Sequence, residues 1–84
     1  MEHEVIMPQL ERTMKRTRIV EWRRMEGHDI KRGQVLFVAE TTKGTYYYES
    51  KVTGVLSRIL VKSGEYVNTQ GVVGIITSDG EEAV

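Results

Sequence analysis

The sequence predicts an all-β fold in which two similar halves pack together as two sheets or a flattened barrel. Short runs of β-branched and aromatic residues alternate with glycine-containing breaks along most of the chain. No window long enough for a helix keeps a 3.6-residue apolar period without a glycine. A weak internal repeat also relates the segment around Gly27 to the segment around Gly64. Strands and a duplicated unit are therefore expected.

Six segments have the composition of strands. In chain order they are Val5–Met7, Arg18–Met25, Val35–Glu40, Thr45–Glu49, Val55–Lys62 and Val72–Thr77. Pro8 ends the first because it has no backbone N–H to donate to a neighbouring strand. The glycines between the later segments mark turns. In the fourth strand Tyr46 and Tyr48 share one face, which we expect to be the core face, and Tyr47 points to the other.

The repeat has consequences for how the chain ends are placed. With Gly27 aligned on Gly64, apolar positions of the two halves coincide, and the aligned pairs are Ile30 with Val67, Val35 with Val72, Leu36 with Val73, Val38 with Ile75 and Ala39 with Ile76. Each half is too small to bury its own apolar face, so the halves should pack together. The same offset aligns Thr42-Lys43 with Asp79-Gly80. If a rotation relates the halves, Lys43 and the chain ends occupy equivalent corners on opposite sides.

Length and composition restrict the function. With 84 residues the chain is expected to be one domain, 1–84, with a core from about residue 3 to 78 and an acidic tail at 79–84. Zero formal net charge argues against a general binder of nucleic acid or membrane surfaces. The absence of cysteine leaves no disulfide or thiol nucleophile. No apolar stretch has membrane-spanning length, and Glu2 and Glu4 stand where a signal peptide is basic and apolar, so a cytoplasmic location is expected.

One stretch departs from this balance. Between Arg12 and Arg32 there are eight basic residues against Glu21, Glu26 and Asp29. Such a cluster is usually a solvated face. The alternative interpretation is a docking surface for an acidic partner.

Lys43 lies in the turn-like segment Glu40-Thr41-Thr42-Lys43-Gly44-Thr45, between two strand-like runs. Gly44 tolerates a positive φ and leaves the backbone beside Lys43 accessible to another protein. A lysine at a hairpin tip is, taken alone, most often a solvated charge. Its surroundings decide whether it is an attachment point.

Those surroundings resemble the lipoyl domains of 2-oxoacid dehydrogenase complexes, in the biotinyl/lipoyl carrier group, from about His3 to Thr77. The matching segments are Val5-Ile6-Met7-Pro8-Gln9-Leu10 with Thr13-Met14, Ile19-Val20-Glu21-Trp22, Glu26-Gly27 with Ile30 and Gly33, Val35-Leu36, Glu40-Thr41-Thr42-Lys43, Val52-Thr53-Gly54-Val55-Leu56, Ile59-Leu60-Val61 and Gly64. The resemblance implies a barrel-sandwich hybrid, a flattened barrel of two four-stranded antiparallel sheets with pseudo-two-fold symmetry. It also implies that Lys43, at a hairpin tip, carries lipoic acid in amide linkage.

By this resemblance the domain is a non-catalytic carrier whose arm moves acyl groups and electrons between active sites. The implied partners are a lipoate-attaching enzyme, a thiamine-dependent 2-oxoacid dehydrogenase, a dihydrolipoyl acyltransferase and a dihydrolipoyl dehydrogenase. Residues expected to take part in recognition by them are Glu40, Thr41, Thr42, Gly44, Tyr47, Arg12, Lys15 and Arg16. The reactive sulfurs would belong to the cofactor, so the lack of cysteine is no objection.

Other classes of function stand beside the carrier. A biotin carrier typically has methionines beside its lysine, whereas Lys43 lies between Thr42 and Gly44. An unmodified barrel-sandwich could serve as an adaptor or structural module. A basic-faced barrel could bind single-stranded nucleic acid through Arg18, Arg23, Arg24 and Tyr47. No metal site is expected, because His3 and His28 lack the spacing and ligand company of one.

Overall fold

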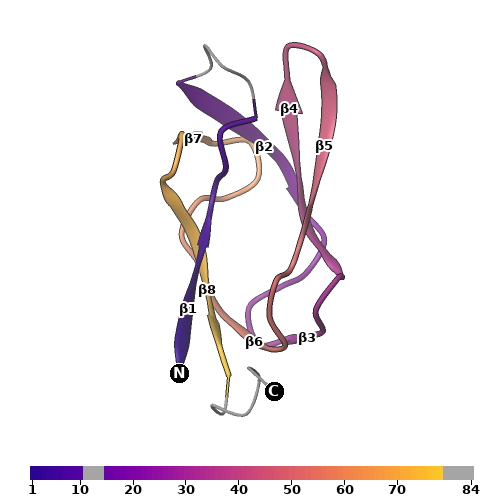
Figure 1. Cartoon of the computed structure of the whole chain (residues 1–84), viewed down its shortest axis with the longest axis vertical. Helices are drawn as coiled ribbons and strands as arrows, with labels where there is room; N and C mark the ends of the chain where they lie inside the picture. The colour runs from indigo at the N-terminus through magenta and orange to yellow at the C-terminus, as the bar shows by residue number, and fades with distance from the viewer. Residues whose placement is uncertain (11–14, 79–84) are drawn as a thin grey trace.

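The computed structural model describes residues 1–10 and 15–78, which form eight strands in two four-stranded antiparallel sheets (Figure 1). The strands are β1 (Glu2–Ile6), β2 (Arg16–Trp22), β3 (Asp29–Ile30), β4 (Val35–Thr41), β5 (Gly44–Glu49), β6 (Gly54–Ile59), β7 (Tyr66–Asn68) and β8 (Val72–Thr77). One sheet has the order β1-β8-β6-β3 and the other β5-β4-β2-β7. The all-β prediction and the two-sheet architecture are confirmed.

Two strands and several strand ends differ from the pattern-based expectation. β3 and β7 contain two and three residues, too few for alternation to reveal them. β2 ends at Trp22 rather than Met25, because a turn closed by the bond from the His28 N–H to the Met25 carbonyl follows it. β6 ends at Ile59 because the N–H groups of Leu60 and Val61 both donate to the Val73 carbonyl, which interrupts the regular strand pairing.

The internal repeat is present in the structure as a two-fold relation between the sheets. The offset that aligns Gly27 with Gly64 also superimposes β2, β3 and β4 on β6, β7 and β8, and β1 corresponds to β5. Gly27 and Gly64 have φ values of 92° and 90°. The N–H of Gly27 donates to Leu56 at 2.8 Å, and that of Gly64 donates to Ile19 at 2.7 Å. Equivalent residues thus make equivalent bonds, which confirms the predicted pseudo-two-fold symmetry.

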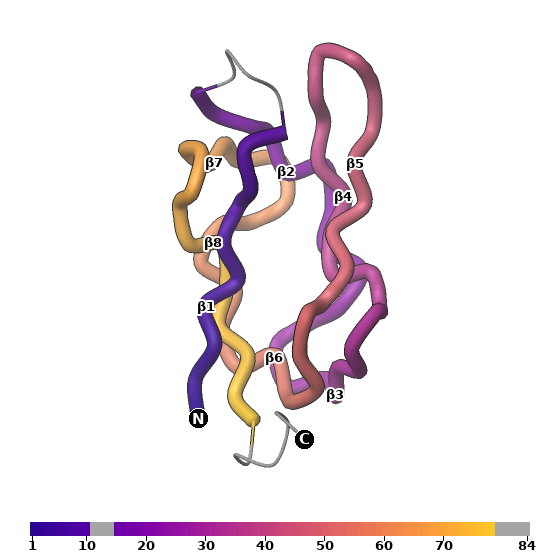
Figure 2. Tube along the Cα trace, in the orientation of Figure 1, coloured from indigo at the N-terminus to yellow at the C-terminus, as the bar shows by residue number. Residues whose placement is uncertain are grey.

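The core lies between the two sheets and draws on both. Its buried members are Val5, Met7, Ile19, Ile30, Leu36, Phe37, Ala39, Tyr48, Leu56, Val67, Val73 and Ile76. Tyr48 is buried and Tyr47 is exposed, as the alternation predicted. The molecule measures 37 × 22 × 18 Å, and its long axis runs from Met1 to the β4–β5 hairpin (Figure 2). The described residues form no helix that could span a membrane.

Candidate functional site

The β4–β5 hairpin presents Lys43 at its tip. Thr41 and Gly44 form the last residue pair of the two strands, so the connection consists of Thr42 and Lys43 alone. Gly44 has a φ of 135°, and Thr42 and Lys43 need no positive φ. A Cβ added to Gly44 would meet no atom within 4 Å. The glycine therefore takes the unusual backbone conformation, and it leaves open space next to an exposed lysine.

The side chain of Thr41 closes this turn. Its Oγ1 accepts a hydrogen bond from the Lys43 N–H at 3.1 Å and donates one to the Gly44 carbonyl at 2.9 Å. These two bonds hold the backbone of Lys43 against the end of the hairpin. The Lys43 amine makes no ion pair with any described residue. A fixed backbone therefore carries an exposed amine.

The tip lies at the far end of the molecule from the described chain ends (Figures 1 and 2). The Met1 amine donates to the Ser78 carbonyl at 2.7 Å, and the Ser78 N–H donates to the Met1 carbonyl at 2.8 Å. Under the two-fold relation this bonded pair is the counterpart of Thr41 and Gly44. The predicted arrangement, with Lys43 and the chain ends at equivalent and opposite corners, agrees with the described residues; Asp79 and Gly80 lie outside them.

The predicted recognition residues fall in three places. Glu40, Thr41, Thr42 and Gly44 gather at the tip, and Glu40 forms an ion pair with Arg18 at 3.5 Å. Tyr47 lies farther along β5, where its ring is 5.6 Å from the guanidinium carbon of Arg23. Lys15 is exposed just before β2, and Arg12 lies outside the described residues.

Arg16 begins β2, and its guanidinium carbon lies 4.8 Å from the ring of Tyr66. Tyr66, a residue that is 57% exposed, is absent from the residues predicted from the sequence. Its strand has only three residues, and the alternation of Tyr66-Val67-Asn68 was the one available signal. The structure therefore adds an aromatic residue to the surroundings of Arg16.

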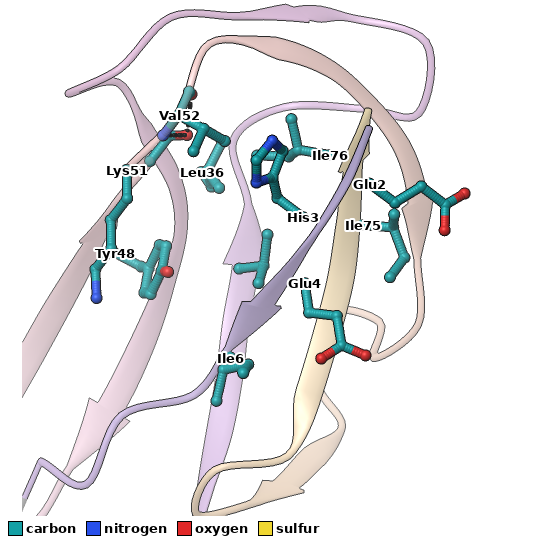
Figure 3. Close-up of a pocket in the computed structure, with 12 residues that line it drawn as sticks. Glu2, His3, Glu4, Ile6, Leu36, Tyr48, Lys51, Val52, Ile75 and Ile76 are labelled. Atoms are coloured by element: carbon teal, nitrogen blue, oxygen red, sulfur yellow. Dashed lines mark hydrogen bonds between the residues drawn. The ribbon is translucent and has the colours of Figure 1, made fainter. Parts of the chain in front are cut away.

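A hollow of about 610 Å³ opens between β1 and β5, away from the tip. Figure 3 shows Tyr48, Lys51 and Val52 on one side of it, with His3 and Ile76 facing them. Nε2 of His3 lies 3.0 Å from Oγ of Ser78. Burial, together with the neighbouring Tyr46, raises the pKa of Tyr48 above its usual value of 10.0. No group of three or more His, Cys, Asp or Glu in the described part of the chain could hold a metal ion.

Comparison with known proteins identifies the family. A profile of the Biotin_lipoyl family, described as biotin-requiring enzyme, matches residues 3–76. The chain belongs to this family. Its sequence is 28% identical over 79 residues to the dihydrolipoyllysine-residue acetyltransferase component of the pyruvate dehydrogenase complex of Rickettsia prowazekii. It is 30% identical over 79 residues to the mitochondrial pyruvate dehydrogenase protein X component of Mus musculus.

These two alignments cover 93% of this Biotin_lipoyl chain in each case, but only 19% and 16% of the relatives. The chain thus spans less than a fifth of the length of these relatives. Among solved structures, the lipoyl domain of the 2-oxoglutarate dehydrogenase complex from Azotobacter vinelandii is similar with a TM-score of 0.77 at 21% identity, covering 92% of this chain and 98% of that one. A single-chain long-chain acyl-CoA carboxylase is similar with a TM-score of 0.75 at 23% identity, covering 94% and 7%. The predicted resemblance to lipoyl domains is confirmed.

Proposed function

We propose that this Biotin_lipoyl domain is a non-catalytic carrier in which Lys43 bears lipoic acid in amide linkage. The observation that carries the proposal is the exposure of Lys43 in a two-residue turn at the end of the long axis, opposite Met1 and Ser78. A carrier needs its attachment point where other proteins can surround it. The hairpin supplies that position.

The residues at the tip fit a covalently attached arm. The Lys43 amine is exposed, and the space beside Gly44 is open for the modifying enzyme and for the arm. Thr41 ties down the Lys43 backbone, so the arm would move about a fixed origin. Lipoate is favoured over biotin because Thr42 and Gly44, rather than methionines, lie beside the lysine.

In this function the lipoyl group supplies a disulfide that can be reduced, can accept an acyl group and can be reoxidised. The chain itself holds the amide, keeps the attachment point outside the core and presents it to several enzymes in turn. The partners proposed for it are a lipoate-attaching enzyme, a thiamine-dependent 2-oxoacid dehydrogenase, a dihydrolipoyl acyltransferase and a dihydrolipoyl dehydrogenase. The similarity to components of the pyruvate dehydrogenase complex supports this set.

The test is enzymatic modification of the full 84-residue chain. Incubation with a lipoate-attaching enzyme, lipoate and ATP should raise the intact mass by one lipoyl amide, and peptide mapping should assign it to Lys43. Lys43→Arg should abolish the mass increase, and Lys51→Arg, at an exposed lysine near the opposite end, should not change it. Because an exposed tip side chain contributes little packing, Lys43→Ala should change stability by less than about 0.5 kcal/mol.

A parallel reaction with a biotin-attaching enzyme decides between the two cofactors of the family. Biotin on Lys43 without lipoate would replace the lipoyl carrier with a biotin carrier. No modification by either enzyme would instead favour an adaptor that uses the same fold without an arm.

A further inference from the structure

The outer face of the β5-β4-β2-β7 sheet carries a band of arginine and tyrosine side chains, here called the arginine–tyrosine face. Strand register places its members in two neighbouring rows flanked by two more arginines. The first row contains Tyr66, Arg18, Glu40 and Thr45, the second contains Glu21, Val38 and Tyr47, and the flanking residues are Arg16 and Arg23. Directly paired residues of antiparallel strands point to the same side. Both rows lie on the side opposite to the buried Ile19, Ala39 and Tyr48, although Val38 is itself only 5% exposed.

Two arginines of this face lie against tyrosine rings. The Arg16 guanidinium lies over Tyr66 and that of Arg23 lies over Tyr47, at 4.8 Å and 5.6 Å. The two tyrosines are 57% and 51% exposed. Arg23 also donates from Nε to Oε2 of Glu21 at 2.8 Å, and Arg18 pairs with Glu40 at 3.5 Å, so Arg16 is the arginine of this face that makes no ion pair with a described residue. A guanidinium held over a ring loses less freedom when it binds a carboxylate. Arginine and tyrosine are also the residues that contribute most at protein interfaces.

The outer face of the other sheet has the opposite chemistry. Its rows consist of Asp29, Val55, Thr77 and Glu2, and of Arg58, Ile75 and Glu4. This outer face has three carboxylates and one arginine. The arginine–tyrosine face, with its flanking residues, has two carboxylates and three arginines. A carboxylate-rich surface would be attracted to one side of the molecule and repelled from the other.

The arginine–tyrosine face is continuous with the Lys43 hairpin. Glu40 and Thr45 of the first row are the residues immediately outside the Thr41–Gly44 pair that closes the turn. β4 and β5 therefore belong to both the face and the tip. A protein held on the face would have the tip at its edge.

We propose that the arginine–tyrosine face docks a carboxylate-rich protein surface, and that this docking fixes the direction from which a partner meets Lys43. The second half rests on the carrier function proposed above, whereas the first does not. Single-stranded nucleic acid fits the face less well. The guanidinium groups of Arg16 and Arg23 lie against the Tyr66 and Tyr47 rings on which bases would stack.

The test uses the full chain labelled with ¹⁵N, with poly-L-glutamate as the carboxylate-rich probe and a single-stranded oligonucleotide of equal charge beside it. Poly-L-glutamate should shift amide signals of β2, β4, β5 and β7, leave the outer face of the other sheet unchanged, and bind more weakly as salt is raised. The Arg16→Glu/Arg23→Glu variant should bind at least about tenfold more weakly. The matched control, Arg58→Glu/Lys62→Glu, has the same net charge and should stay within about twofold of the parent.

Equal losses in the two double variants would overturn the proposal, because they would show attraction to net charge alone. Tighter binding of the oligonucleotide would assign the face to nucleic acid, and no binding of poly-L-glutamate would remove the face as a docking site. Dispersed amide spectra must show that both variants are folded. The mass assay at Lys43, run on the parent chain, tests the carrier function separately, so the two ideas fail by different measurements.

Discussion

Equivalent rows of the two sheets face each other across the core and contain very different side chains. In one sheet Trp22, Phe37 and Tyr48 are paired across three strands, and in the other their counterparts are Ile59, Gly74 and Val5. The aromatic rings contact one another, with centroids 5.0 Å apart for Trp22 and Phe37 and 4.9 Å for Phe37 and Tyr48. One row is large where the other is small.

The difference shows that a symmetric backbone can enclose an asymmetric core. A Cβ added to Gly74 would lie 3.3 Å from the ring of Trp22, so the missing side chain on one sheet makes room for the aromatic residues of the other. Two identical aromatic rows could not both fit, and two aliphatic rows would leave a void. The halves are thus alike in hydrogen bonding and complementary in volume.

Phe37→Ala should have the largest effect on this arrangement. Phe37 is fully buried at the centre of the aromatic row, so its truncation should cost about 3–5 kcal/mol of unfolding free energy. Val5→Ala, in the opposite row, should cost about 1.5 kcal/mol. Guanidinium denaturation monitored by Trp22 fluorescence measures both. Equal losses would mean that the two rows contribute alike.

Gly74→Ala should cost less, about 1–3 kcal/mol, because the new methyl group would lie 2.9 Å from the Arg58 carbonyl oxygen as well as near Trp22. Trp22→Phe replaces the indole by a smaller ring and so removes the atom nearest to the new methyl group on the Trp22 side. The double variant should therefore lose less than the sum of the two single losses, by at least about 0.5 kcal/mol. If the two losses were strictly additive in the same denaturation experiment, Gly74 and Trp22 would not be energetically coupled.

Thr41→Val compares the hairpin tip with its counterpart at the chain ends. Loss of the hydroxyl removes the bonds to the Lys43 N–H and the Gly44 carbonyl, at a cost of about 0.5–1 kcal/mol in this exposed turn. Amide exchange at Lys43 should become faster, while exchange at Ser78 should not change. Thr41→Ser, which retains the hydroxyl, should restore the slower rate. An unchanged exchange rate in the valine variant would show that the two-residue turn is stable without the Thr41 hydroxyl.

The smallest effect is expected at alkaline pH and concerns Tyr48. Burial raises its pKa in the folded state above 10.0, whereas the unfolded chain ionises near that value. The native state then retains a proton that the unfolded state loses, so stability should be constant below about pH 10 and fall as the pH rises above it. Tyr48→Phe should make this decline shallower in urea denaturation series. A stability that rises above pH 10 would contradict the assignment.

Much of this molecule could be predicted from its sequence, because the informative signals are local. Val72–Thr77 was predicted with its observed ends, and the glycine after Lys43 correctly marked the turn. The arginine–tyrosine face could not be assembled from pattern alone. A bulge between Ile19 and Glu21 shifts the alternation, so that Arg18 points outward and Trp22 inward although their spacing suggests one face. The contact of Arg16 with Tyr66, which is paired with Arg18, also depends on the register of a three-residue strand.

The bonded pair of Met1 and Ser78 makes the fold suitable for circular permutation. If residues 79–84 were replaced by two residues that link Ser78 to Met1, they would complete a second hairpin, equivalent to the first, at the other end of the long axis. If the chain were then opened at an exposed loop such as residues 62–65, and a lysine were built into the new turn, the domain would have two handles pointing in opposite directions. Such a molecule would have two lysine-bearing hairpins of the same shape, of which only one would adjoin the arginine–tyrosine face. Comparing reactions at the two lysines would separate the effect of the hairpin's shape from the effect of the face.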